Sequence, residues 1–478
     1  MLNKDEKFYI TSAIVYTNAP PHLGFSLEII QADVLARYHR LLGDDVFFLT
    51  GTDEHGAKIV RAAEKAGQTP LKFTDEISKK YQELTKSLNL SNDDFIRTTD
   101  QKRHWPGVRK AWLTIKEKGD IYKKEYEGLY CVGCEAFVKE KDLVNGVCPL
   151  HQQKPEIIRE ENYFFKLSKY ADIVKEKIVS GEIKIIPDGR KNEIISFINQ
   201  GIEDVSCSRS KENLKWGIPV PEDNTQIIYI WFEALINYIS ALGYDKNSAK
   251  FKKYWPADVH CVGKDIFRFH ALLWPAILLA LGLDLPKAIF VHGYITSGGQ
   301  KMSKSLGNVV DPFKLAEKYS TDAVRFFLLR EIPSTEDGDF SEEKFKERYN
   351  GDLASGLGNL VARVEKLAQL AKTKKINSEK SLIAEYKIAL GSSKEKYQES
   401  LGRFEFSMAL SAVWELIKFC DQEVEKNKLW EKSTEKKNII SNLLFLIDEI
   451  AELLAPFLPE TSHKILKGKI KESLFPRI

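Results

Sequence analysis

Apolar and polar positions in the first fifty residues follow two regular patterns. Residues 7–16 form an apolar run, which ends at Asn-Ala-Pro-Pro over 18–21. Apolar residues then recur at helical spacing from Leu27 to Leu41, and a second apolar run covers residues 45–50. Strand, loop, helix and strand in this order predict the opening of a doubly wound α/β domain. Such domains bind nucleotides at the carboxyl ends of their strands.

The pattern changes twice further along the chain. Residues 118–225 interrupt it like an insertion, and strands are expected again at 227–231, 257–263 and 288–295. Beyond about residue 345 the apolar positions have helical spacing almost throughout, with a linker near 372–375. We therefore expect an α/β core at 1–117 and 226–296, an insertion at 118–225, a connecting segment at 297–345 and a helical region at 346–478.

Composition adds weak limits. The chain has 478 residues, 43% of them hydrophobic, and 71 basic against 68 acidic residues, a balance that neither demands nor excludes nucleic acid. The first seven residues lack the apolar core of a signal peptide, and the longest apolar run, 271–283, is shorter than the roughly 20 residues of a membrane span. A cytoplasmic protein is expected. We also expect a monomer, because the sequence ends at Ile478, soon after the helical region.

The cysteines favour a metal site over disulfides. Of six cysteines, Cys131 and Cys134 form a Cys-x-x-Cys pair, and Cys148 follows with His151 three positions on. Three thiolates and one imidazole form a closed tetrahedral zinc site, whose role is structural. The other three are expected to be buried apolar residues or free thiols: Cys207, Cys261 and Cys420.

Two short motifs suit a polyphosphate. Lys301 and Lys304 lie in a serine-bearing loop after Gly298-Gly299, and their ammonium groups could hold phosphates while charge moves onto the leaving oxygen. His22 and Gly24 lie at a strand-to-helix turn, where a glycine admits the nucleotide and the helix amino end favours phosphate. Either motif alone is more typical of an ordinary loop. Their order and the residues between them favour the phosphate site.

Together these motifs resemble the signatures of class I aminoacyl-tRNA synthetases, and the residues between them are similar to those of the methionyl-tRNA synthetase family. The resemblance spans almost the whole chain. It implies a Rossmann-type catalytic core with a zinc-bearing insertion of the single-knuckle form, followed by an all-α anticodon-binding bundle. The implied reaction joins methionine and ATP as methionyl-adenylate, then transfers methionine to the terminal adenosine of initiator and elongator methionine tRNA. Such a reaction needs positioning and charge stabilisation, with Mg²⁺ on the phosphates.

The resemblance also implies roles for individual residues. His22, Lys301 and Lys304 are the expected catalytic residues, and Asp265 is expected to bind the ribose of ATP. Asp53 would hold the ammonium of methionine. The further expected ATP-binding residues are Gly24, Phe25 and Gly263, and the methionine-binding residues are Ile14, Tyr16, Asp53, Trp231, Ala234, Leu235, Tyr238, Ile266 and His270. Without the family context, Asp265 would fit a helix cap and the aromatic stripe from Trp231 a protein core.

In the helical region, Asn359 and Arg363 are four residues apart on one helix face, where they could contact base edges. Trp430 could stack on an unstacked base of the anticodon. A helix-surface Asn and Arg and a half-buried Trp are also common without any such role, so this expectation depends on the resemblance.

Three positions depart from the family pattern. Phe25 replaces a histidine and cannot donate a hydrogen bond to phosphate, while Leu235 and Leu429 replace prolines. Two alternatives therefore stay open. One is a class I synthetase for another apolar amino acid or for cysteine, and the other, suggested by Phe25, is a tRNA-binding or regulatory paralogue without catalytic activity.

Overall fold

The computed structural model describes residues 6–150, 152–302, 308–431, 436–468 and 473–478. The chain divides into two compact units, and each is built from segments distant in sequence. Unit 1 comprises Met1–Pro21, Leu42–Thr85 and Ser91–Val291; unit 2 comprises His22–Leu41, Lys86–Leu90 and His292–Ile478.

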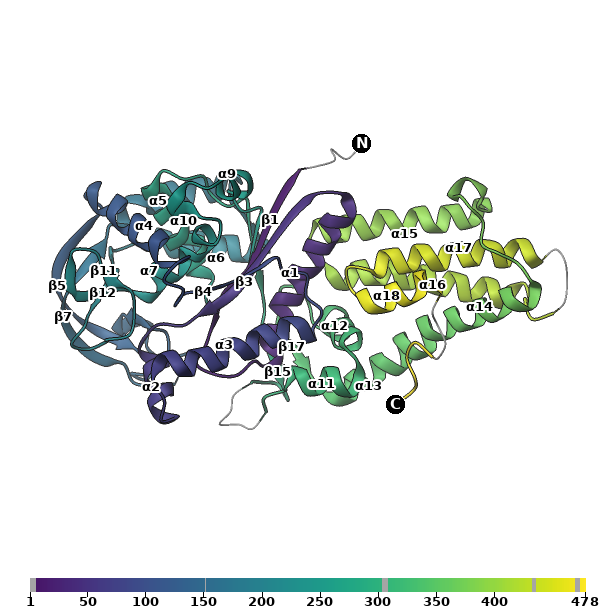
Figure 1. The fold of residues 1–478 in the computed structure, drawn as a ribbon, viewed down its shortest axis with the longest axis horizontal. Helices are drawn as coiled ribbons and strands as arrows, with labels where there is room; N and C mark the ends of the chain where they lie inside the picture. Colours follow the sequence, from purple (N-terminus) through teal and green to yellow (C-terminus); the bar gives the residue numbers. More distant parts are fainter. Residues whose placement is uncertain (1–5, 151, 303–307, 432–435, 469–472) are drawn as a thin grey trace. The chain divides into compact units, whose positions relative to one another are not determined.

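Unit 1 is organised around a seven-stranded sheet, as the apolar runs predict. Its order is β2-β3-β1-β13-β14-β8, with β4 beside β3. Figure 1 labels three of these strands, β1, β3 and β4. The pairs β1–β3, β1–β13, β3–β2, β3–β4 and β14–β8 are parallel. The strands are β1 (Lys7–Ser12), β2 (Val15–Tyr16), β3 (Asp45–Asp53), β4 (Asp94–Arg97), β8 (Lys184–Ile186), β13 (Val259–Gly263) and β14 (Ala288–His292). The doubly wound α/β fold is thereby confirmed.

Helices of unit 1 bury their apolar residues in one continuous core with this sheet. Trp112 and Trp274, both fully buried, belong to α4 and α10, which pack on each other. The helices are α2 (Ala57–Lys65), α3 (Pro70–Ser87), α4 (Trp105–Glu117), α5 (Leu167–Ser180), α6 (Asp188–Asn199), α7 (Ile230–Leu235), α8 (Asn237–Ser240), α9 (Ala249–Tyr254) and α10 (Trp274–Leu281).

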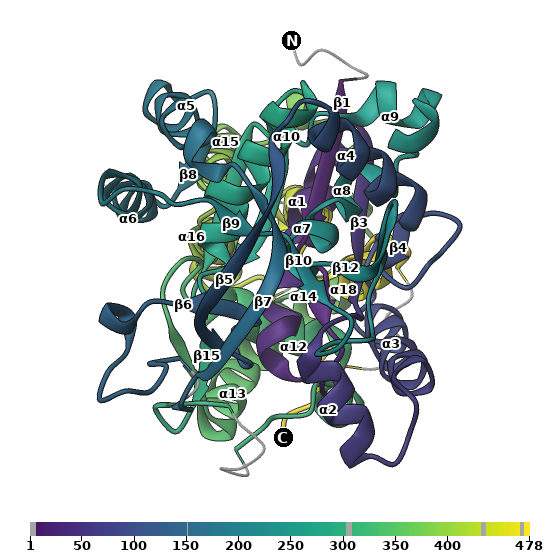
Figure 2. The same cartoon turned by 90° about the vertical axis from the view of Figure 1, so that its left-hand side faces the viewer.

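The stretch expected as an insertion forms a second sheet, of order β6-β5-β7-β9. Its long antiparallel pair, β5 (Ile121–Cys131) and β7 (Glu156–Phe165), runs side by side in Figure 2. The short strands are β6 (Ala136–Val138) and β9 (Val205–Ser206). From the same stretch, however, β8 joins the core sheet beside β14. The expected division at residues 118 and 225 remains a prediction.

The prediction of a core strand at 227–231 is wrong, both in the sheet to which the strand belongs and in the residue at which it ends. β12 (Asp223–Ile228) lies in a separate antiparallel sheet, between β10 (Ser208–Ser210) and β11 (Pro219–Val220). At Tyr229 the chain turns into α7, because the Tyr229 carbonyl accepts the amides of Phe232 and Glu233. A short apolar run does not distinguish a strand from a buried helix, and this run contains the end of one and the start of the other.

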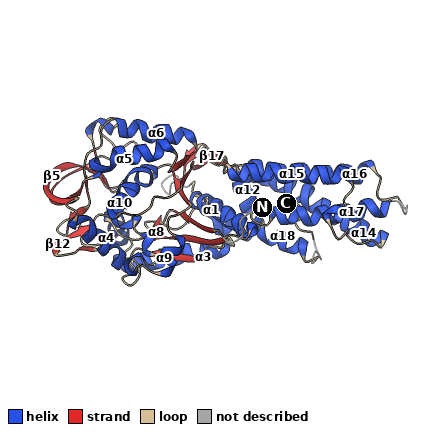
Figure 3. Ribbon diagram, turned by 90° about the horizontal axis from the view of Figure 1, so that it is seen from above, coloured by secondary structure: helices blue, strands red, loops and turns tan. Residues whose placement is uncertain are grey.

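Unit 2 is mainly helical (Figure 3). Arg325 is fully buried in this unit, where it pairs with Asp33 at 2.8 Å and donates to the carbonyls of Pro456 and Phe457. No helix in the described ranges is long and apolar enough to cross a membrane. The helices of unit 2 are α1 (Leu23–Leu42), α11 (Pro312–Tyr319), α12 (Thr321–Arg330), α13 (Glu342–Arg348), α14 (Asn359–Ala371), α15 (Ala384–Gly402), α16 (Phe406–Lys426), α17 (Lys436–Leu454) and α18 (Pro459–Leu466).

Candidate active site and cysteine cluster

Asp53 is the last residue of β3, at the carboxyl edge of the core sheet. The parallel register places it opposite Tyr16 on β2. Asp53 is 7% exposed, and its Oδ1 has no hydrogen-bond partner among the described residues. Burial raises the pKa of Asp53 well above its usual range, and the carboxylates of Glu233 and Glu135 raise it further. A buried carboxylate oxygen without a partner is costly, so this site is suited to a cationic ligand.

An aromatic group of four residues, Trp231, Tyr238, Phe269 and His270, lies in the same unit. The Trp231 ring stacks on Phe269 with centroids 3.8 Å apart. His270 is bonded through Nδ1 to the carbonyl of Ile266 at 3.0 Å and through Nε2 to the Tyr238 hydroxyl at 2.8 Å. Burial lowers the pKa of His270 to about 4, so the ring is neutral. Its Nδ1 therefore donates to the carbonyl and its Nε2 accepts from Tyr238.

All nine residues expected to bind methionine belong to unit 1. The structure brings Tyr16 beside Asp53, and Tyr238 and Ile266 onto His270. The other four are buried or half-buried in the same unit: Ile14, Trp231, Ala234 and Leu235. Gly263 ends β13, and its carbonyl accepts the amide of Ile266 across a turn that exposes Asp265.

Sequence reasoning missed a buried polar network next to this group. Glu233, fully buried on α7, is bonded to His55 Nδ1 and to His104 Nε2, each at 2.8 Å. His104 Nδ1 is bonded in turn to the Ser240 hydroxyl at 2.9 Å. Burial would raise the pKa of Glu233, but the two imidazoles hold it below its usual value. No pattern in the sequence links these partners, since each bond joins distant segments.

The turn expected to contact phosphate belongs to unit 2. The Gly24 amide donates to His22 Nδ1 at 3.1 Å. A neutral imidazole that accepts at Nδ1 carries its proton at Nε2, which is the donor that a phosphate oxygen needs. A Cβ on Gly24 would lie 2.9 Å from His22 Cε1, so any side chain there would displace the ring. Phe25 follows in the first turn of α1 and offers no polar side-chain atom.

The residues before the two lysines form a tight hairpin in unit 2. β15 (Ile295–Ser297) and β16 (Gln300–Lys301) are antiparallel, and Gly298 and Gly299 between them have φ of 64° and 71°. Two consecutive positive φ angles are typical of a two-residue hairpin turn. Asp339, on β17 (Gly338–Phe340), accepts the Gly299 amide at 2.8 Å and the Thr296 hydroxyl at 2.6 Å. The side chain of Lys301 and the whole of Lys304 lie outside the described residues.

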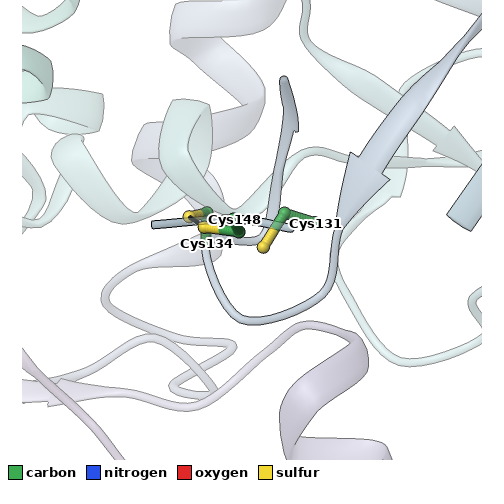
Figure 4. A group of neighbouring side chains, drawn as sticks. All are labelled: Cys131, Cys134 and Cys148. Carbon is green, nitrogen blue, oxygen red and sulfur yellow. Dashed lines mark hydrogen bonds between the residues drawn. The ribbon is translucent and has the colours of Figure 1, made fainter. Parts of the chain in front are cut away.

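Three cysteines converge at the end of β5 (Figure 4). The sulfur atoms of Cys131, Cys134 and Cys148 lie within 4.8 Å of one another, with Cys134 and Cys148 at 3.6 Å. Zn–S bonds of about 2.3 Å in a tetrahedron place sulfurs about 3.8 Å apart, so this cluster fits a zinc ion. Burial raises the pKa of the Cys134 thiol, an effect that a bound cation would reverse. His151, the expected fourth ligand, lies outside the described residues.

The residues expected to contact the anticodon lie in the helical part of unit 2. Asn359 is exposed at the start of α14, and Trp430, beyond α16, is 54% exposed. Arg363 is bonded to Asp421 at 3.4 Å and to Glu425 at 2.5 Å, both on α16. A surface cavity of about 380 Å³ adjoins these acids and is lined by Gly356, Trp414, Ile417, Lys418, Asp421, Gln422 and Glu425.

A parallel α/β core and a helical region after it are shared with a known class of enzyme. The family described as tRNA synthetases class I (M) matches residues 8–154 and 134–365, and the anticodon-binding domain of tRNA ligase matches residues 389–476. The chain is thus of the class I tRNA synthetase type.

Its relatives narrow the class. The methionine–tRNA ligase of Thermotoga maritima is 40% identical and that of Bacillus subtilis 41%, over 96% and 99% of this chain and 75% of each relative. A solved Mycobacterium tuberculosis methionyl-tRNA synthetase in complex with methionyl-adenylate is 37% identical, with a TM-score of 0.91 over 96% of this chain and 93% of that one. The chain belongs to the methionyl-tRNA synthetase family.

Proposed function

We propose that the chain is a methionine–tRNA ligase. Methionine and ATP form methionyl-adenylate and pyrophosphate, and the methionyl group then passes to the 3′ terminal adenosine of methionine tRNA. Relatives over nearly the whole chain carry this activity in their names, and a structural neighbour holds methionyl-adenylate.

The observation that best supports an amino-acid substrate is the buried Oδ1 of Asp53 beside Tyr16, which has no hydrogen-bond partner in the described part of the chain. An ammonium group would satisfy that oxygen and offset the burial of the carboxylate. Trp231 and Tyr238 contribute aromatic faces of the kind that favour a thioether sulfur. For this reason we assign the nine unit 1 residues to methionine.

ATP binding is assigned to Gly263 and Asp265 together with His22, Gly24 and Lys301. Lys304 and Phe25 complete the set by sequence. In-line attack by the methionine carboxylate needs no general base, because the nucleophile is already ionised. His22 Nε2 would donate to a phosphate oxygen, and the lysines would stabilise charge on the departing pyrophosphate, to which Mg²⁺ also contributes.

The remaining assignments rest on the same resemblance. Zinc is proposed for Cys131, Cys134, Cys148 and His151, and anticodon contacts for Asn359, Arg363 and Trp430. The partner is methionine tRNA, initiator and elongator. We further propose a cytoplasmic monomer.

ATP–pyrophosphate exchange with single amino acids tests the proposal. Exchange that depends on methionine, and is weak with leucine, isoleucine, valine and cysteine, is the expected result. Exchange driven by one of the other amino acids would move the chain to the alternative synthetase.

Phe25 supports one competing function, a tRNA-binding paralogue without catalysis. That function predicts binding of methionine tRNA with no exchange in the presence of methionine. Phe25→His in the same assay shows whether the missing phosphate donor limits the rate, since a large gain in exchange would identify Phe25 as the cause.

A further inference from the structure

The loop that carries the cysteine pair also carries a buried carboxylate, Glu135. This residue directly follows Cys134, is 4% exposed, and has φ of 51°, in the left-handed region. Such a backbone angle in a residue with a long side chain is uncommon and is kept only where surrounding contacts fix it. Glu135 has three such contacts through its side chain.

The carboxylate of Glu135 accepts all three of those hydrogen bonds. Its Oε1 accepts from the Tyr16 hydroxyl at 2.8 Å and from the Lys58 amide at 2.5 Å. Its Oε2 accepts from the Tyr130 hydroxyl at 2.5 Å. The Lys58 amide belongs to the first turn of α2, where helix amides lack partners within the helix and a negative charge is stabilising. Glu135 therefore caps α2 from a distant segment.

Both anchored elements border Asp53. Tyr16 is its register partner on β2, and α2 begins four residues after it, behind Gly56. Gly56 has φ of 104°, and a Cβ there would lie 2.6 Å from the Tyr16 hydroxyl oxygen and 3.0 Å from Glu135 Oε1. A side chain at Gly56 would therefore displace the Tyr16 hydroxyl or the Glu135 carboxylate, and the hydrogen bond between these two groups holds the hydroxyl in place.

The same loop holds a second residue of the aromatic group. Trp231 Nε1 donates to the backbone carbonyl of Cys134 at 3.3 Å, and the Tyr229 hydroxyl donates to the carbonyl of Glu135. Two consecutive residues of the cysteine loop therefore contact Tyr16 and Trp231. Tyr16 and Trp231 are both assigned to methionine, and they belong to different segments of unit 1.

We propose that Glu135 is a positioning residue for the amino-acid pocket, holding the Tyr16 hydroxyl and the start of α2 in the geometry that methionine requires. The inference rests on the proposed function. Glu135 itself need not touch the substrate. Its effect should appear in methionine binding and be transmitted through Tyr16, with little effect on ATP.

The test compares Glu135→Ala, Tyr16→Phe and the double variant. Methionine Kd is measured by calorimetry without ATP, and the KM values for methionine and for ATP by pyrophosphate exchange. Glu135→Ala should raise Kd and KM for methionine on the order of tenfold, the effect of losing a hydrogen bond to a charged group, with KM for ATP within about twofold of wild type. The double variant should be no worse than Glu135→Ala, because both changes break one interaction.

Tyr122→Phe is the matched control, since Tyr122 lies on the same strand as Tyr130 and donates to a carboxylate, that of Asp204, at 2.9 Å. It should leave the methionine values unchanged. An unchanged methionine Kd in Glu135→Ala would overturn the proposal, as would effects of the two changes that multiply. Loss of zinc with equal rises in both KM values would also overturn it, by showing collapse of the loop.

If Glu135→Ala does not fold, Tyr16→Phe alone decides, because the proposal requires a weaker methionine Kd when the hydroxyl is removed and Glu135 is intact. These outcomes are separate from failure of the proposed function. If the proposed function were wrong, wild type itself would show no pyrophosphate exchange that depends on methionine.

Discussion

Asp53→Asn tests the amino-acid site most directly. The change removes a charge and keeps the shape of the side chain at a position where Oδ1 has no described protein partner. Truncating one member of a buried, hydrogen-bonded charge pair costs about 2–5 kcal/mol. A mid-range loss of about 3 kcal/mol corresponds to a rise of roughly 150-fold in KM for methionine. KM for ATP should change little, because Asp53 is not assigned to the nucleotide.

Although Asp53→Asn should bind methionine more weakly, the folded variant should be more stable than wild type. Burial, with Glu233 and Glu135 nearby, raises the pKa of Asp53, so the ionised carboxylate is less favourable in the folded chain than in the unfolded one. An acid whose folded pKa is raised destabilises the fold once the pH exceeds its unfolded pKa. Asp53→Asn should therefore melt at a higher temperature than wild type at pH 7 without ligand. Methionine should narrow that difference by stabilising wild type more.

A ligand without the ammonium group provides the control. The 2-hydroxy analogue of methionine lacks the ammonium, so its binding should be similar in wild type and Asp53→Asn. Calorimetry with both ligands gives the discrimination ratio, which should fall by about the same 150-fold in the variant. A variant that keeps the ratio, or that melts lower than wild type while binding methionine normally, would refute the assignment of Asp53 to the ammonium.

Three further changes have defined outcomes. Asp33→Asn leaves the buried Arg325 without its charge partner and should lower the free energy of unfolding in urea by about 3–5 kcal/mol, whereas Lys318→Ala, which breaks an exposed pair with Glu342, should change it little. Cys148→Ser should abolish the expected one zinc per chain in elemental analysis, and Cys420→Ser, a buried cysteine outside the cluster, should keep it. Burial lowers the pKa of His270 to about 4, so between pH 6.5 and pH 4 the unfolded chain takes up a proton that the folded chain does not. Stability should fall as the pH drops through that window, and less steeply in His270→Gln.

The apolar pattern predicted the elements that pair with near neighbours in the sheet. Lys7–Ser12 and Asp45–Asp53 are strands because continuous apolar runs suit a parallel strand covered on both faces. The same signal failed at Tyr229, where an apolar run continues from β12 into α7. The spacing of apolar residues could not have placed β8 beside β14, since the two strands are far apart in the sequence and pair only in the tertiary structure.

Site residues show the same limit. Asp53, Tyr16 and His270 entered through the family resemblance, which fixes residue types at motif positions. Glu135 and Glu233 are outside those motifs. Their roles depend on hydrogen bonds to residues far away in the sequence: Tyr16 is 119 positions from Glu135, and His55 is 178 positions from Glu233. Only the tertiary structure supplies such partners.

Three buried carboxylates near the proposed amino-acid site differ in how fully the protein satisfies them. Asp53, Glu135 and Glu233 are buried close enough together that the last two raise the pKa of the first. Glu233 is compensated by two imidazoles and Glu135 by two hydroxyls and a helix amide, while Asp53 has an oxygen with no described partner. A fold selected for stability alone would not leave a buried carboxylate oxygen unsatisfied beside two carboxylates that are satisfied. The oxygen of Asp53 without a described partner therefore supports the proposed contact with the ammonium of methionine, while the hydrogen bonds of Glu135 and Glu233 hold the residues beside it.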